Sequence, residues 1–129
     1  MAHLHNVVPA DACARVIAEM LERDGYVIVE RLASELVSRA VTELRSHVDA
    51  TSRDNTFFEG KNIRNVEGLV TRSEAACELM IHPTILAIVD QVLLPYCVRY
   101  QLNWTSCRHL EPGCEDQYLH PSHPGDPSP

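Results

Sequence analysis

The sequence predicts an α+β domain, with amphipathic helices in its amino-terminal part and short strands between and after them. Apolar residues repeat at the spacing of one helical face in four separate segments. Other segments are rich in β-branched residues, or alternate between apolar and polar side chains, which is typical of strands. The length of 129 residues sets an upper limit of one domain.

The composition is that of a globular protein with an acidic balance. Hydrophobic residues make up 45% of the chain and charged residues 22%, and 18 acidic against 11 basic side chains give a net charge of −7. An acidic chain lacks the positive surface that neutralises phosphates, so neither nucleic acid nor an anionic membrane is expected as a partner. In addition, no window approaches the roughly 18 apolar residues of a membrane-spanning helix.

The cysteine pattern and the first eight residues indicate the cellular compartment of the protein. Five cysteines are an odd number, and no two of them form a Cys-x-x-Cys pair. The stretch Met1–Val8 lacks the basic region and long apolar run of a secretory signal. Both observations predict a reducing, cytoplasmic location.

The first predicted helix presents an apolar face that starts at Cys13. Pro9 and Asp11 suit its first turn, because a missing N–H is harmless there and a negative charge meets the helix dipole. Gly25 ends the helix, since glycine adopts the left-handed conformation without steric cost. The β-branched residues of the next segment, Tyr26–Glu30, predict a short strand.

Three more helices are predicted. Ser34 is a suitable N-cap for one that runs to about Ala50. Its apolar face consists of Leu36, Val37, Ala40, Val41, Leu44 and Val48. Another helix is expected from Ser73 to Ile81, and the last begins at Pro83 and is closed by Pro95.

Polar and proline-rich segments separate or follow these elements. Thr51–Gly68 is predicted to be a long loop with at most a brief strand near Ile63–Val66. Glu111–Gly113 predicts a turn, and Gln117–His120 resembles the start of a strand. Because proline cannot donate to a sheet, the four prolines of Pro121–Pro129 predict a disordered tail after a domain of residues 1–120.

The clearest predicted strand is Cys97–Thr105. Its apolar side chains, Val98, Tyr100, Leu102 and Trp104, alternate with the polar Arg99, Gln101, Asn103 and Thr105. We expect the apolar face, including Trp104, to lie in the core. The polar face either meets solvent or lines the inside of a barrel that holds a charged ligand, and periodicity alone does not separate these alternatives.

The order of these segments resembles that of the phytanoyl-CoA dioxygenase family. The resemblance spans about residues 10–120, and its individual motifs are loose but their order is more specific. It rests on the first helix, the strand in Asp24–Glu30, the second helix, the long loop, the helix after His82-Pro83, the stretch Tyr100–Asn103, the turn Glu111–Gly113 and the closing Gln117–His120.

Members of this family are Fe(II)- and 2-oxoglutarate-dependent oxygenases built on a jelly-roll double-stranded β-helix. The resemblance implies that this chain contains the amino-terminal helices and first strands of such a fold, and that it acts on a small-molecule substrate if complete. It further implies that Arg99, Gln101 and Asn103 face the barrel interior as cofactor-binding residues. His120 stands where the family has its first iron ligand.

Two features depart from the family pattern. The aspartate expected two residues after His120 is Ser122, whose hydroxyl supplies neither the charge nor the affinity of a carboxylate for Fe(II). The second histidine and the basic residue that pairs with 2-oxoglutarate would lie beyond Pro129. We therefore expect a truncated member that is inactive alone, and assign no catalytic residue.

Two non-enzymatic alternatives remain open. In one, the sheet edge left by missing strands pairs with another chain, including a second copy. In the other, zinc stabilises a small domain, although the spacing of the available ligands does not match the usual zinc sites. Those ligands are Cys107, His109, Cys114, His120 and His123.

Overall fold

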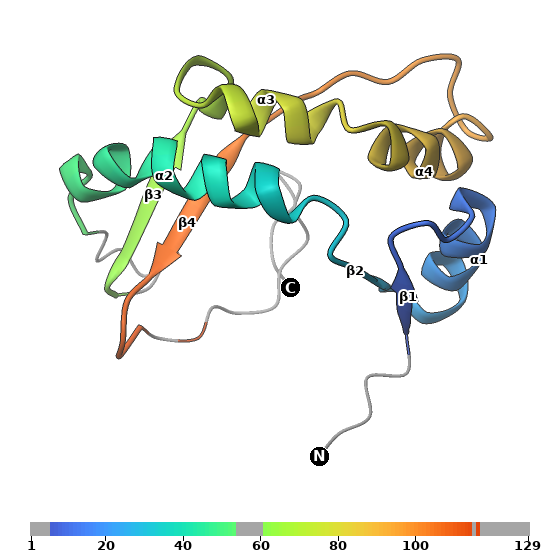
Figure 1. Ribbon diagram of the computed structural model, residues 1–129, viewed down its shortest axis with the longest axis horizontal. Helices are drawn as coiled ribbons and strands as arrows, with labels where there is room; N and C mark the ends of the chain where they lie inside the picture. The colour runs from blue at the N-terminus through green and yellow to red at the C-terminus, as the bar shows by residue number, and fades with distance from the viewer. Residues whose placement is uncertain (1–5, 54–60, 115, 117–129) are drawn as a thin grey trace, which may run out of the picture.

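The computed structural model describes residues 6–53, 61–114 and 116. In chain order, the elements are β1 (Val7–Pro9), α1 (Ala14–Asp24), β2 (Ile28–Glu30), α2 (Ser34–Ala50), β3 (Ile63–Glu67), the short 3₁₀ helix η1 (Leu69–Thr71), α3 (Glu74–Met80), α4 (Pro83–Leu93) and β4 (Ser106–Leu110). Figure 1 shows α1, α4 and the β1–β2 pair on one side, and α2, α3 and the β3–β4 ribbon on the other. This mixture of helices and strands agrees with the predicted α+β class.

The first three elements form a small β-α-β unit. β1 and β2 are parallel, with Val7 opposite Ile28, and α1 provides the crossover that parallel strands require. Gly25 ends α1 as predicted, with a φ of 78° and its N–H donating to the carbonyl of Leu21 at 2.9 Å. Pro9 does not belong to the first helical turn, as expected from sequence, but is the last residue of β1.

A second group of elements encloses the largest cluster of buried side chains. Leu44 and Val48 lie one turn apart on α2, so both project from the same face of the helix. The cluster is completed by Val66 of β3, Leu69 of η1 and Ala76 of α3, with Met80 and Cys107 packed against it. Val37 and Val41, which we expected on the buried face of α2, are instead 50% and 54% exposed. The buried face of α2 is therefore narrower than the apolar face that its sequence predicts.

A glutamate and a serine join α2 to α3. Ser73 is the N-cap of α3: its hydroxyl accepts a hydrogen bond from the N–H of Ala76 and donates one to the carboxylate of Glu43 on α2. Glu43 also accepts from the N–H of Ala75 at 3.1 Å. The Ser73 hydroxyl and this backbone N–H together lower the pKa of the Glu43 carboxyl.

Two helix starts test the predicted caps. Ser34 is the first residue of α2 rather than its cap; Ala33 occupies the N-cap, without a side-chain hydrogen bond. At α4 the ring of His82 accepts from the N–H of Thr84 at 3.3 Å, and Pro83 is the first helical residue as predicted. The helices themselves are therefore confirmed, and the α2 cap lies one residue earlier.

The strand predicted at Cys97–Thr105 is wrong. These residues carry no strand, and β4 begins directly after them, at Ser106, where it pairs antiparallel with β3. The alternation of side chains is present, but a strand also needs a neighbour for its backbone, and β3 pairs with Ser106–Leu110 instead. The expected core side chain Trp104 is consequently 62% exposed.

Among the described residues, no single helix is long and apolar enough to cross a membrane. α3 and α4 taken together, with a bend of 42° between them, meet the same length and composition criteria.

Candidate functional site

The three predicted cofactor-binding residues lie in the irregular segment that connects α4 to β4. Arg99, Gln101 and Asn103 are all exposed. Arg99 and Gln101, together with Tyr100 between them, line a hollow of about 500 Å³. Asn103 is not among the described residues that line this hollow. The structure thus brings two of the three residues to one concave surface.

Tyr100 attaches this segment to α4. Its hydroxyl donates a hydrogen bond to the carboxylate of Asp90 at 2.6 Å. That hydrogen bond, together with burial and the negative charge of Asp90, raises the pKa of the Tyr100 phenol, because the neutral phenol is the form that donates. The contact joins the residue between Arg99 and Gln101 to α4.

His120, the iron ligand that the resemblance implies, and Ser122 lie outside the described part of the chain. Within residues 6–53, 61–114 and 116, no three His, Cys, Asp or Glu side chains come close enough to hold a metal ion. Cys107, His109 and Cys114, three of the ligands considered for zinc, therefore do not form a site among themselves.

A carboxylate held by two arginines lies where β4 ends, and sequence analysis did not identify it. Glu111 accepts hydrogen bonds from the Nε atoms of Arg53 at 2.6 Å and Arg64 at 2.8 Å. The Glu111 and Arg64 side chains are only 19% and 18% exposed. These hydrogen bonds from Arg53 and Arg64 lower the pKa of the Glu111 carboxyl.

Arg64 also caps the end of α2. Its Nη1 donates to the carbonyl oxygens of Val48, Asp49 and Thr51, the last at 2.6 Å. Carbonyls in the last turn of a helix have no partner within the helix, and a positive charge is favourable beside them. One arginine therefore links α2, β3 and the residue that follows β4.

The turn after β4 has the position that the sequence predicted. The N–H of Cys114 donates to the carbonyl of Glu111 at 3.1 Å, and the N–H of Glu111 donates to the carbonyl of Asn62 at 3.1 Å. Gly113 has a φ of 82°, a conformation that other residues adopt only with strain. The turn and the Glu111 contacts together set the direction in which the chain leaves β4.

The comparisons with known proteins identify a class of oxygenase. The family model described as phytanoyl-CoA dioxygenase (PhyH) matches residues 1–125, so the chain belongs to this family. Dioxygenase trt7 of Aspergillus terreus is 28% identical over 109 residues, which cover 80% of this chain and 38% of that relative. The matched region therefore corresponds to well under half of the relative's length.

Proposed function

We propose that this chain forms the amino-terminal part of an Fe(II)- and 2-oxoglutarate-dependent dioxygenase domain, and that it is inactive alone. The observation that carries the proposal is the family match over residues 1–125, combined with Ser122 in the position where the resemblance expects a carboxylate after His120. In this reading the chain supplies the helices and first strands of a jelly roll, up to about residue 120. Residues 121–129 are a proline-rich tail.

The uncovered surface of α4 supports this assignment. Ile88 is its one buried residue among those described, although eight of the 11 residues of the helix are apolar. A helix with so wide an apolar face normally packs that face against further structure. Exposed Ile85, Leu86 and Leu93 would be covered if additional strands of a jelly roll packed there.

The site residues follow from the same proposal. Arg99 and Gln101, at the hollow beside Tyr100, and Asn103 further along are the candidates for contacts with the cosubstrate. His120 is the candidate for the first iron ligand. Ser122, in the position of the expected carboxylate, is the reason to expect weak metal binding and no turnover.

The experiment that tests this proposal is an anaerobic incubation with Fe(II) and 2-oxoglutarate, followed by oxygen and measurement of succinate. We expect no succinate from the natural sequence, and none from Ser122→Asp, because one restored ligand does not complete a site. Arg45→Met, on the exposed side of α2, is a control for nonspecific change. Succinate formed by the natural chain or by Ser122→Asp would contradict the proposal.

A second candidate function, self-association, is favoured by the apolar residues between α4 and β4. Tyr96, Val98, Leu102 and Trp104 are between 60% and 99% exposed, and the described β3 and β4 pair only with each other. Exposed apolar side chains and free strand edges promote association. Light scattering would show a dimer or larger species; a monomer at all concentrations would exclude it. Val98→Ser with Trp104→Ser should shift the distribution towards the monomer.

The cellular setting is part of the proposal. All five cysteines are unpaired, as a reducing compartment would require. We therefore propose a cytoplasmic protein whose complete domain acts on a small molecule.

A further inference from the structure

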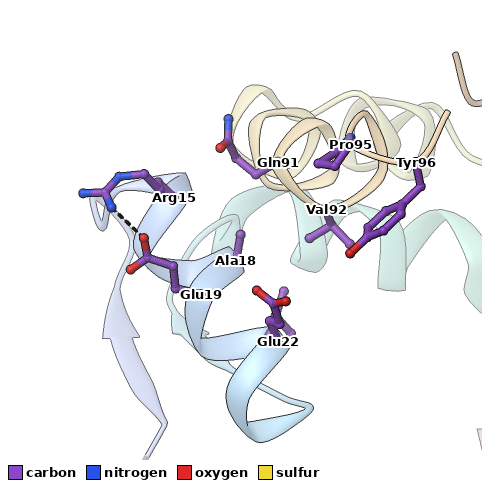
Figure 2. Close-up of a pocket in the computed structure, with 9 residues that line it drawn as sticks. Arg15, Ala18, Glu19, Glu22, Gln91, Val92, Pro95 and Tyr96 are labelled. Atoms are coloured by element: carbon purple, nitrogen blue, oxygen red, sulfur yellow. Dashed lines mark hydrogen bonds and ion pairs between the residues drawn. The ribbon is translucent and has the colours of Figure 1, made fainter. Parts of the chain in front are cut away.

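A groove runs between α1 and the end of α4, and its described lining differs from that of the hollow at Arg99 and Gln101. It has a volume of about 500 Å³, which is within the usual range of about 300–1,000 Å³ for small-molecule sites. Its lining includes the apolar Ala18, Leu21, Val92 and Pro95 and the polar Glu22 and Tyr96. Figure 2 shows the two walls, with Ala18 and Glu22 on α1 facing Val92, Pro95 and Tyr96.

The electrostatic character of the groove is negative. Arg15 and Glu19, which also line it, neutralise each other in an ion pair of 2.5 Å. Glu22 has no ion-pair partner within the part of the chain that the structure describes, so its charge is not compensated. α4 has no basic residue in its last turn, where the helix dipole is negative. A positively charged group is therefore the complementary occupant.

An aromatic ring stands on the opposite wall. Tyr96 is 85% exposed, and Figure 2 shows its ring directed from the end of α4 towards Val92. The face of a tyrosine ring attracts cations. Ala18, with its small side chain, leaves the space between the helices open.

We propose that this groove binds a small organic ammonium ion with an apolar body. The body lies against Leu21, Val92 and Pro95, and the ammonium group pairs with the carboxylate of Glu22 beside the ring of Tyr96. No described residue lines both this groove and the hollow at Arg99 and Gln101, so this proposal is independent of the oxygenase assignment.

The test is a titration of the full chain with phenethylamine, followed by two-dimensional NMR of backbone amides. We expect saturable shifts concentrated at Ala18, Leu21, Glu22, Val92 and Tyr96, with weak affinity typical of a ligand of this size. Phenethyl alcohol and 3-phenylpropionate provide neutral and negative analogues of the same shape. Both should bind at least threefold more weakly than the amine, because they lack the positive charge that pairs with Glu22 and with the ring of Tyr96.

Variants locate the interaction. Glu22→Gln should weaken amine binding about threefold, whereas Glu30→Gln, which removes an exposed carboxylate on β2, should not. Ala18→Leu should fill the groove and reduce binding of all three compounds, and circular dichroism shows whether each variant remains folded. If Ala18→Leu unfolds the chain, Tyr96→Leu tests the other wall instead: loss of the ring should weaken binding of the amine more than binding of the alcohol. Equal binding of amine and alcohol, shifts elsewhere, an unchanged affinity in Glu22→Gln or no binding would each overturn the proposal.

Discussion

Arg64 and Glu111 are 47 positions apart in sequence and joined by a hydrogen-bonded ion pair of 2.8 Å. Arg64 lies on β3, and Glu111 directly follows β4. Because Arg64 also donates to three carbonyls at the end of α2, this pair connects a helix to both strands of the antiparallel ribbon. The pair thus joins through polar contacts some of the same elements that the apolar cluster around Leu44 joins through packing.

We predict that Arg64→Met lowers the free energy of unfolding by about 1–3 kcal/mol, because it leaves partly buried carbonyls and the Glu111 carboxylate without their donor. Urea denaturation followed by circular dichroism measures this change. Arg45→Met on the exposed surface of α2 is the matched control and should change stability by about 0.5 kcal/mol or less. Equal effects of the two substitutions would show that the Arg64 contacts are not stabilising.

Stability should decrease in acid because of Glu111 and Glu43. Both carboxyls have a pKa lowered by hydrogen-bond donors in the folded protein. A lowered pKa stabilises the fold above the unfolded value of about 4.3, and the contribution is lost as the pH falls through the folded pKa. The urea midpoint should therefore fall below about pH 4.3, and less steeply in Glu111→Gln. An identical acid dependence in Glu111→Gln would exclude Glu111 as a source of it.

Two residues of α2 test the position of the core. Leu44 is 7% exposed and belongs to the main buried cluster, whereas Val41 on the same helix is 54% exposed. Leu44→Ala should cost about 2–5 kcal/mol through lost burial and the cavity left behind. Val41→Ala should cost about 0.5 kcal/mol or less. Chemical denaturation measures the free energy of unfolding of the two variants. A larger decrease in Val41→Ala than in Leu44→Ala would show that α2 does not bury the face that contains Leu44.

The four helices could be predicted because the spacing of apolar residues and the residues that begin or end a helix are visible within each short segment of sequence. Gly25 and Pro83 mark two helix ends that the structure confirms. Sequence analysis did not predict β1, because a strand of three residues is too short to show an alternation of apolar and polar side chains. Its partner β2 is also separated from it in sequence by the whole of α1. The Arg64–Glu111 pair was missed for a related reason: nothing local indicates which distant residues will meet.

The strand error has a different cause. Alternation at Val98, Tyr100, Leu102 and Trp104 indicates which side chains would share a face, but not whether a partner strand is present. The described neighbour, β3, pairs from Ser106 onwards. The predicted contacts of Arg99, Gln101 and Asn103 with a cosubstrate therefore remain a proposal.

Tyr100 should restrain the segment between α4 and β4. Tyr100→Phe removes the hydroxyl that donates to Asp90, so we predict faster tryptic cleavage after the exposed Arg99. Tyr96→Phe is the control, since Tyr96 is 85% exposed and has no hydrogen bond to its hydroxyl within the described chain. Limited proteolysis followed by mass spectrometry compares the two variants. Unchanged cleavage in Tyr100→Phe would mean that another contact holds this segment.

The chain belongs to the phytanoyl-CoA dioxygenase family, and our central claim, made as a proposal, is that residues 1–129 do not by themselves form the iron and cosubstrate site. Its most direct test is an anaerobic thermal melt of the 129-residue chain, with and without Fe(II) plus 2-oxoglutarate. A ligand that binds the folded state raises the melting temperature by mass action. We predict no increase with both additions. An increase that requires both, and that is abolished by His120→Ala, would contradict the claim and show a functional site.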